Sequence, residues 1–302
     1  MYDIIGYRKT WYAFSAALFA VAVILLLTIG LPLGVDFRGG SSLEITLSGE
    51  RPSQETLTKL LEDTLKEKVA VQAVGDKGFL IRLPETKEQQ HQELLTLLRD
   101  KIDKNLQEEH FQTVGPIIGS QLRTKALQAI VLSLALISLY IAWMFRPRTR
   151  VSTVSSWVFG LGALIALFHD LIIPIGFYTL FVRYGGAEVN TDLIAALLTI
   201  LGYSMSDTVV VYDRVRENLT RGGGSFEEIV NRSVNETIKR SVYTSVATLL
   251  AILAVALFGG VTIRYFSWIL IVGIASGTYS SIFIASAFLV SWWKHQNRAT
   301  AR

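Results

Sequence analysis

The 302-residue sequence contains no cysteine, which excludes disulfide bonds, thiolate metal sites and cysteine nucleophiles. Charged residues are also scarce, at 18% of the chain, whereas soluble domains average about 25%. Hydrophobic residues make up 51%, and the formal net charge is only +4. So small a positive charge is better explained by loops that set membrane topology than by a nucleic-acid-binding surface. The composition therefore predicts a membrane protein.

A nucleotide-binding loop is also missing from the sequence. Two glycine-rich stretches, Arg38–Ser41 and Arg221–Ser225, lack the GxxxxGK[ST] spacing that cradles phosphates. His91 and His110 are lone histidines in a polar stretch, without the convergent partners that a site needs, so we expect both at the surface. We therefore expect no catalytic residue, no metal site and no cofactor, and the chain is not predicted to be an enzyme.

Six apolar segments are long enough to cross a membrane, which takes about 20 residues. They are Trp11–Leu33, Lys125–Phe145, Val151–Val182, Asp192–Tyr212, Ser241–Phe258 and Tyr265–Trp293. The first is too long for a signal-peptide core and is followed by no cleavage site, so it predicts an uncleaved anchor. The third contains Pro174 and Gly176 and is predicted to be one tilted or kinked helix.

Six spans place both termini on one side of the membrane, and the charges of the short loops indicate which side. Basic residues precede the first span and follow the second, fourth and sixth: Arg8, Lys9, Arg146, Arg148, Arg150, Arg214, Arg216, Arg221, Arg232, Lys239, Arg240, Lys294, Arg298 and Arg302. The opposite short loops hold only Arg183 and Arg264. The positive-inside rule therefore predicts a multi-pass membrane protein with both termini in the cytoplasm.

The predicted organisation has four parts. Residues 1–33 form the cytoplasmic N-terminus and the first helix, and residues 34–123 form an extracytoplasmic domain. Residues 124–293 form the other five helices, with a cytoplasmic loop at 213–240, and residues 294–302 form a cytoplasmic tail. Within the loop, Ser225 and Glu228 have capping-box spacing, which predicts a short amphipathic helix on the membrane surface.

The polar stretch at 34–123 predicts a β-α-β-β-α-β order. SSLEITL alternates as a strand does, and leucines at helical spacing follow Pro52 and Ser53. VAVQAV and FLIRL flank the glycine turn GDKG as a hairpin, and HFQTVG closes the set. The second helix is predicted to begin at Thr86, with Gln89 at capping-box spacing. The predicted fold is thus a bundle of six transmembrane helices with one α+β ferredoxin-like domain between helices 1 and 2.

Asp207 is the main candidate functional residue, because it lies inside the fourth span. It is about five residues from the cytoplasmic end, or roughly 8 Å into the bilayer. A charge at a helix centre costs about 3 kcal/mol, and an aspartate avoids that cost by taking a proton, since burial disfavours the charged form. These properties suit a proton relay. The alternative is a structural hydrogen bond or ion pair between helices.

Other charges lie near the same end. Arg240 opens the fifth span and is followed by a stripe of hydroxyl residues at helical spacing, Ser241, Thr244, Ser245 and Thr248. It is either a counter-charge for Asp207 or an ordinary positive-inside flank. Asp213 and Arg214 mark the exit of the fourth span, as supporting charges or as an interfacial pair.

Two further patterns lie within the spans. His169 and Asp170 precede Pro174, which locally opens the third span. If neighbouring spans are antiparallel, this pair lies far from Asp207 along the membrane normal, as an outer proton port or as a satisfied polar kink. In the sixth span, a small residue at every fourth position predicts close helix packing: Gly273, Gly277, Ser281 and Ala285.

Several motifs together resemble one family. They are GVDFRGGS at 34–41, VGPIIGSQL at 114–122, HD at 169–170, GYSMSDTVVVYDRVREN at 202–218 and FGG at 258–260. In this order, over nearly the whole chain, they resemble the SecF branch of the SecD/SecF protein-export family, within the resistance-nodulation-division (RND) superfamily. Four residues of the first motif mark the entry to the outer domain: Asp36, Arg38, Gly39 and Gly40.

The resemblance implies a function that residue spacing does not show. A SecF-type chain pairs with a SecD-type chain, either separate or fused, in the cytoplasmic membrane of bacteria or archaea. The SecDF pair assists the SecYEG channel, with YidC and secreted preproteins as further partners. It uses the proton motive force in late steps of export, while ATP hydrolysis belongs to the SecA motor.

By the same resemblance, Asp207 matches the proton-relay aspartate and Arg240 the basic residue that opens the fifth span, with Asp213 and Arg214 as the exit pair. Two alternatives remain open at this point: half of a proton-coupled RND-type exporter of small solutes or lipids, and a non-transporting scaffold. A single outer domain of roughly ninety residues argues against the exporter, because efflux porters of this superfamily carry larger outer domains with substrate clefts.

Overall fold

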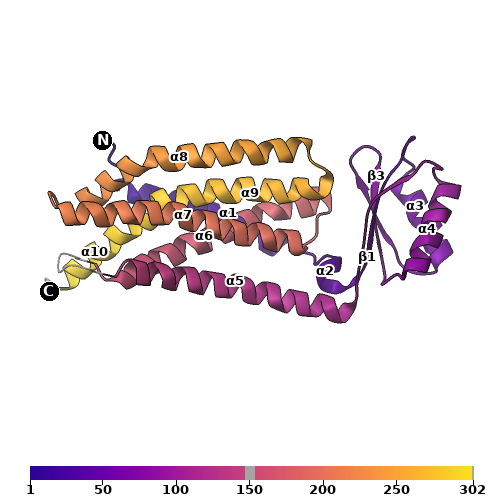
Figure 1. Cartoon of the computed structure of the whole chain (residues 1–302), viewed down its shortest axis with the longest axis horizontal. Helices are drawn as coiled ribbons and strands as arrows, with labels where there is room; N and C mark the ends of the chain where they lie inside the picture. Colours follow the sequence, from indigo (N-terminus) through magenta and orange to yellow (C-terminus); the bar gives the residue numbers. More distant parts are fainter. Residues whose placement is uncertain (147–153, 301–302) are drawn as a thin grey trace. The chain divides into compact units, whose positions relative to one another are not determined.

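In the computed structural model, residues 1–146 and 154–300 are described, and six long apolar helices are each long enough to cross a membrane. They are α1 (Arg8–Ile29), α5 (Pro116–Met144), α6 (Ser156–Gly185), α7 (Thr191–Arg221), α8 (Phe226–Phe258) and the run that begins with α9 (Val261–Ser280) (Figure 1). Six spans were predicted and six are found. The predicted topology-setting residues Arg148, Arg150 and Arg302 lie outside the described residues.

Two spans contain special backbone. The segment with Pro174 is one continuous helix, α6, as predicted. The last span has a π-helical turn at Ser281–Ala285 before it continues as α10 (Ser286–Thr300). Such a turn inserts one extra residue and is frequent at functional sites. Here it coincides with the second half of the small-residue stripe.

The predicted loop at 213–240 is wrong. Helix α7 runs on to Arg221 and α8 begins at Phe226, so only a short turn with glycines at positive φ separates them. Ser225 and Glu228 do form the predicted capping box, since the Ser225 amide donates to Glu228 Oε2 at 2.7 Å. The helix that they start is not a separate surface helix, however. It continues without a break into the fifth span, because its polar side chains find partners on α7 and on the N-terminal segment.

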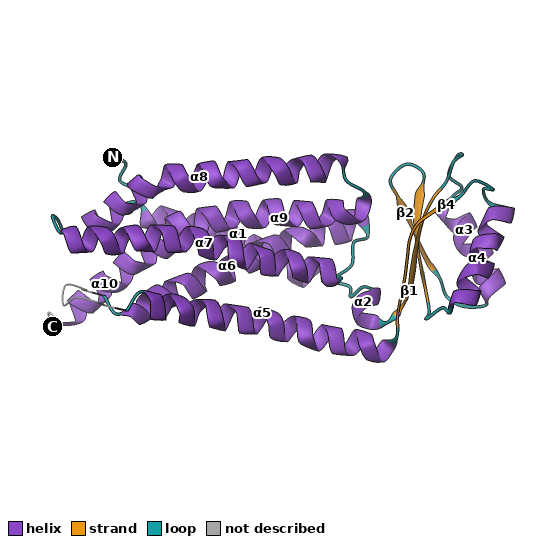
Figure 2. Ribbon diagram, viewed as in Figure 1, coloured by secondary structure: helices purple, strands orange, loops and turns teal. Residues whose placement is uncertain are grey.

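The smaller compact unit contains a four-stranded antiparallel sheet in the order β2-β3-β1-β4 (Figure 2). Its elements follow one another as α2 (Val35–Arg38), β1 (Gly40–Thr46), α3 (Gln54–Leu65), β2 (Ala70–Val74), β3 (Gly78–Leu83), α4 (Glu88–Lys101) and β4 (Gln107–Val114). Alternate strand residues such as Leu43, Ile45 and Ile81 are fully buried against Leu57 and Leu98 of the helices. The predicted order of strands and helices is therefore present.

The start of α4 differs from the prediction by one residue. The Lys87 amide donates to Gln90 Oε1 at 3.0 Å, so the cap is at Lys87 rather than at Thr86 with Gln89. Thr86 belongs to the preceding turn, where its amide donates to Ser41 Oγ at 2.8 Å. A hydrogen bond to a strand residue fixes Thr86 outside the helix.

The expectation that His91 lies at the surface is also wrong. His91 is 4% exposed and stacks on Phe111 with ring centroids 3.7 Å apart. It precedes Leu94, Leu95 and Leu98 at helical spacing, and this face of α4 packs on the sheet. His110, on the edge strand β4, is exposed as expected.

Asp103 ties the start of β4 to the end of β1 and should make the sheet domain sensitive to acid. Its carboxylate accepts from the Ser48 hydroxyl at 2.7 Å and amide at 2.6 Å, and these bonds hold its pKa at about 2, below the ordinary 3.8. A lowered carboxyl pKa stabilises the fold above the unfolded value, and this contribution is lost as pH falls through the folded value. Asp103→Asn should therefore lower the domain's unfolding temperature at pH 6 but leave it unchanged near pH 2, by scanning calorimetry. An equal loss at both pH values would contradict this assignment.

Candidate functional site

Asp207 lies on α7 with its carboxyl buried, 7% exposed. Within the described residues, the hydroxyl at hydrogen-bond distance is that of Ser245 on α8, at 3.5 Å from Oδ2. The Ser241 hydroxyl, one turn earlier, approaches the same carboxyl but has no hydrogen-bond partner there. Ser245 is itself engaged with Thr278 Oγ1 at 2.6 Å. The Thr278 hydroxyl also approaches the Asp207 carboxyl, which is therefore removed from water among three hydroxyls of α8 and α9 but has one long hydrogen bond in the described chain.

Arg240 precedes Ser241 on α8, and its side chain is exposed. Its charge acts on the Asp207 carboxyl, but no ion pair joins these two residues within the part of the chain that the structure describes. The predicted counter-charge is thus near the carboxyl and not bonded to it.

Asp170 on α6 is the opposite case, because it is fully buried and fully bonded. Its carboxylate accepts hydrogen bonds from three hydroxyls on α7 and α9 and contacts the neighbouring imidazole: Ser204 at 2.6 Å, Ser280 at 2.6 Å, Ser276 at 3.1 Å and His169 Nδ1 at 3.0 Å. Hydroxyl donors of this kind satisfy a carboxylate in a dry interior.

The expectation that His169 and Asp170 lie far from Asp207 is wrong. Ser204, which donates to Asp170, is three residues before Asp207 on α7, and residues at this spacing share one helix face. From Ser204 the polar contacts continue, since Ser281 donates to its carbonyl at 3.2 Å and contacts Thr208 Oγ1 at 2.8 Å. Asp170 is thus bonded to the face of α7 that carries Asp207, one turn from it.

The small-residue stripe is what brings α9 close to α7. A Cβ on Gly273 would lie 2.1 Å from Ile200, and one on Gly277 would lie 2.8 Å from the Ser204 Cβ. Further along, Ser281 bonds to Ser204 and Thr208, and the Ala285 carbonyl accepts from the Tyr212 hydroxyl at 3.2 Å. Every stripe residue therefore contacts α7, the helix that carries Asp207.

Gly277→Val should open this interface. The added side chain would meet the Ser204 backbone as well as its Cβ, so α9 must move away and weaken the bonds to Asp170. Overpacking of this kind costs about 1–3 kcal/mol. Gly202→Val is a matched control, because a Cβ at that exposed α7 position meets nothing within 4 Å. Thermal unfolding in detergent should show a lower midpoint for Gly277→Val only; equal midpoints would refute the close approach.

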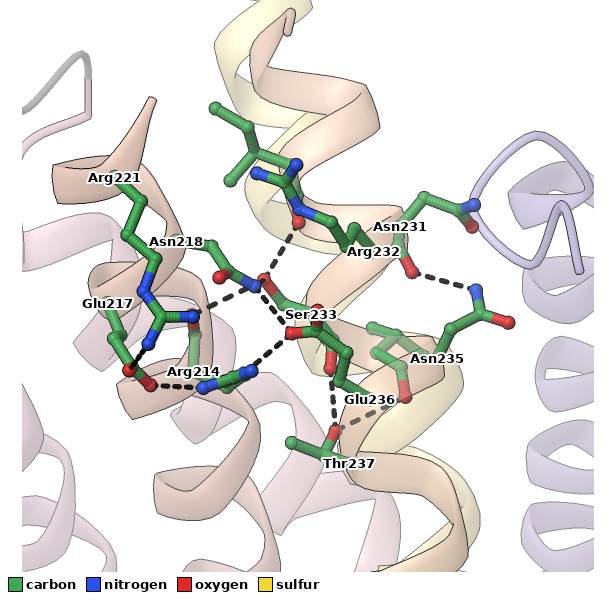
Figure 3. A network of polar contacts seen from close by, with 12 residues as sticks. Arg214, Glu217, Asn218, Arg221, Asn231, Arg232, Ser233, Asn235, Glu236 and Thr237 are labelled. Carbon is green, nitrogen blue, oxygen red and sulfur yellow. Dashed lines mark hydrogen bonds and ion pairs between the residues drawn. The ribbon is translucent and has the colours of Figure 1, made fainter. Parts of the chain in front are cut away.

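Arg214 belongs to a separate polar network at the ends of α7 and α8, shown in Figure 3. Its guanidinium donates to Glu236 on α8 at 2.6 Å and to Glu217 at 2.5 Å, and Asn218 also donates to Glu236 at 2.8 Å. Asp213 is exposed and is not its partner. Arg214 thus fastens the α7–α8 hairpin and does not contact Asp207.

The chain's N-terminal segment packs on the same part of α8. Asn231 accepts from the amide of Ile4 at 2.9 Å and that of Ile5 at 3.1 Å. Arg8 pairs with Glu227 at 2.6 Å, and Lys294 of α10 pairs with the same carboxylate. The N-terminus, the α7–α8 turn and α10 therefore lie at one end of the bundle.

The sequence pointed to Asp207 and Asp170 but missed their partners on α9. Ser276, Thr278 and Ser280 were overlooked, although they lie in an apolar span beside the small-residue stripe. Hydroxyls placed next to such a stripe can bond across a close helix contact, and this was the available signal. No group of three metal-ligating side chains occurs among the described residues.

Comparison with known proteins relates this site to a family. Residues 95–295 match "Protein export membrane protein SecD/SecF, C-terminal", and residues 24–49 match the "SecD/SecF GG Motif". The chain is 39% identical to protein translocase subunit SecF of Thermobaculum terrenum, covering 97% of this chain and 94% of that one. It is 37% identical to the SecF of Rhodothermus marinus, covering 100% and 95%.

A solved structure shows the same likeness in three dimensions. The crystal structure of SecDF from Thermus thermophilus, described as a translocon-associated membrane protein, matches with a TM-score of 0.82 at 35% identity. The match covers 96% of this chain and 38% of that longer chain.

Proposed function

Because this chain belongs to the SecD/SecF family of protein-export membrane proteins, we propose that it is the SecF subunit of a SecDF complex. In this role it uses the proton motive force to promote late steps of protein export through the Sec translocon. The observation that carries the proposal is the Asp207 carboxyl, buried in a membrane span with a single long hydrogen bond among the described residues. Ionisable groups inside a membrane mark proton or ion pathways by default.

The contrast between the two buried aspartates supports different roles for them. Asp170 accepts three hydroxyl hydrogen bonds, which hold its side chain in one place. Asp207 has one hydrogen bond within the described chain, at 3.5 Å, and the hydroxyls of Ser241 and Thr278 also approach it, so neither its charged nor its neutral form is held by short hydrogen bonds. A relay group must exist in both forms during a cycle, which fits Asp207. Asp170 then positions Ser204, which lies one turn before Asp207 on α7. Arg240 supplies positive charge near the Asp207 carboxyl.

The membrane orientation is part of the proposal. The N-terminus, the α7–α8 turn and α10 lie at one end of the bundle, and most of the basic residues of the short loops belong to that end. By the positive-inside rule this end faces the cytoplasm. The sheet domain then lies outside, where a translocating chain emerges. Its order β2-β3-β1-β4 with two helices is that of a ferredoxin-like domain.

The proton motive force is large enough for such work. One charge crossing 100 mV yields about 2.3 kcal/mol. Reversing a two-state population from 1:99 to 99:1 takes about 5.5 kcal/mol, so one proton biases a conformational change and several drive it to completion. A SecD subunit with its own six spans completes the relay, and SecYEG, YidC and secreted preproteins are the remaining partners.

A vesicle export assay tests this function. Inverted membrane vesicles with SecYEG, SecA and the SecD partner are loaded with a partly translocated preprotein, and ATP is then removed. With this chain present, a proton gradient should move the preprotein forward, and a protonophore should stop it. Gradient-driven movement of equal size in vesicles without this chain would contradict the proposal. Gradient-driven transport of a lipophilic organic cation by the same vesicles would favour the exporter instead.

A further inference from the structure

We infer that Asp36 is a positioning residue that ties the outer sheet domain to the first turn of α7, the helix that carries Asp207. Asp36 lies in the GVDFRGG motif, for which the residues themselves suggest no chemistry. The inference deepens the proposed function and rests on it for its transport aspect. All contacts involved belong to one compact unit, which contains both Leu31–Leu127 and Gly186–Thr191.

Asp36 is 5% exposed, and both oxygens of its carboxylate are used. Oδ2 accepts from the Thr191 amide at 2.7 Å and from the Thr191 hydroxyl at 2.5 Å. Oδ1 accepts from the Gln112 side chain on β4 at 2.7 Å. Thr191 is the first residue of α7, where amides have no partner within the helix and a negative charge is favoured. One side chain therefore bonds to an edge strand of the sheet and to the start of a membrane span.

The glycines of the motif hold Asp36 in this place. Gly39 has φ +82°, and a Cβ on it would lie 2.7 Å from the Pro116 Cα at the start of α5. Gly40 has φ +120°, and a Cβ there would lie 2.8 Å from the Leu83 carbonyl on β3. Positive φ and contacts this close admit only glycine at low cost. The short helix α2 is thus fixed between α5 and the sheet, with Asp36 aimed at Thr191.

The connection from α6 to α7 is held along its length by the same unit. Val189 forms a parallel bridge with Leu33, and its amide donates to the Pro32 carbonyl at 2.8 Å. Arg82 on β3 pairs with Glu188 at 2.8 Å and donates to the Gly186 carbonyl at 3.2 Å. The segment between the two spans is therefore bonded to the sheet at one end and to Asp36 at the other.

A displacement of α7 should therefore be transmitted to the sheet domain. Thr191 and Asp207 are separated by about 24 Å of one continuous helix, which transmits axial shifts. A change at Asp207 that displaces α7 also displaces Thr191. The hydrogen bonds of Asp36 to Thr191 and Gln112 pass this displacement to the sheet. Asp36 thus couples movement of α7 to the sheet domain without taking part in proton transfer.

The test compares Asp36→Ala with Asp63→Ala, an exposed carboxylate on α3 of the same domain, in the full chain with its SecD partner. Asp36→Ala should keep gradient-driven proton flux while preprotein moved per proton falls about tenfold, within the usual range of coupling between sites. Asp63→Ala should change neither quantity. A parallel fall of flux and export by one factor, or no change in either, would overturn the coupling role.

A rescue experiment separates coupling from damage. Because the chain has no cysteine, a cysteine pair replacing Leu33 and Val189 is free of background thiols in this subunit. Bridge partners lie about 4.8 Å apart, within disulfide range. In the Asp36→Ala background, oxidation of this pair should restore export per proton, and reduction should abolish it again. If oxidation did not restore export per proton, the proposed link between the sheet domain and α7 through Asp36 would be wrong.

Hydrogen exchange at the Thr191 amide decides the structural part independently of transport. Asp36→Ala should speed exchange there on the order of tenfold or more, since the amide loses its acceptor. Unchanged exchange would overturn the role of Asp36 even if transport proceeds. If the wild-type complex moves no protons, the proposed function fails, and this measurement still settles whether Asp36 holds α7.

Discussion

Asp207→Asn should abolish proton-driven export, lowering gradient-dependent proton flux and preprotein movement by on the order of 100-fold or more. Asparagine has nearly the same shape and keeps a contact to Ser245, but it cannot gain and lose a proton in the membrane. Since the carboxyl has so few bonds in the described chain, its replacement removes little structure. The measurement is proton flux in proteoliposomes containing the SecD partner, alongside the vesicle export assay.

The control for this prediction lies six residues away on the same helix. Asp213→Asn removes a carboxyl of the same type that is exposed on α7, and flux should stay near the wild-type value. Unfolding temperatures of both variants should match that of the wild type. Full flux in Asp207→Asn, or an equal loss in both variants, would rule out Asp207 as the relay.

Asp170→Ala should have the second large effect, on the stability of the bundle. The change removes the acceptor of three buried hydroxyls and leaves a cavity where α6, α7 and α9 meet. Interhelical hydrogen bonds in membranes average about 0.6 kcal/mol each, so the three together are worth roughly 2 kcal/mol, before any cost of the cavity. Because Ser204 loses its anchor one turn from Asp207, proton flux should also fall.

Asp170→Asn separates the structural role from titration. The asparagine side-chain oxygen still accepts hydrogen bonds from hydroxyls, and its amide nitrogen donates to them. Most hydrogen bonds of the α6–α7–α9 contact should therefore survive. We expect near-wild-type unfolding in detergent and substantial proton flux for this variant. If Asp170→Asn stopped proton flux as completely as Asp207→Asn, Asp170 would itself be a relay group and its assignment as a positioning residue would be wrong.

The sequence predicted the spans and the sheet well because both depend on local patterns. Apolar segments of sufficient length and alternating strand residues lead to the same elements in the structure. Asp207 stood out for a similarly local reason, since a carboxylate in an apolar span needs an explanation. The small-residue stripe of the sixth span indicated close packing in the same way.

Two of the errors came from contacts between distant residues, those on the loop and on His91. The loop at 213–240 proved helical because Glu236 and Asn231 have partners on α7 and at the N-terminus, which no local pattern reveals. His169 and Asp170 were expected far from Asp207 on the premise that neighbouring spans are antiparallel, and this inference was faulty. Asp170 lies 15 residues before the end of α6 and Asp207 lies 16 residues after the start of α7, so antiparallel helices place both at a similar depth. His91 of α4 was expected at the surface because its ring partner Phe111 lies on β4, twenty residues further along the chain.

Infrared difference spectroscopy of the reconstituted complex tests the central claim most directly, because it observes carboxyl protonation itself. A pH jump should produce a band of a protonated carboxyl group in the wild type. If Asp207 is the relay, this band is absent in Asp207→Asn and retained in Asp170→Asn and Asp213→Asn. A band that persists in Asp207→Asn and disappears in Asp170→Asn would contradict it.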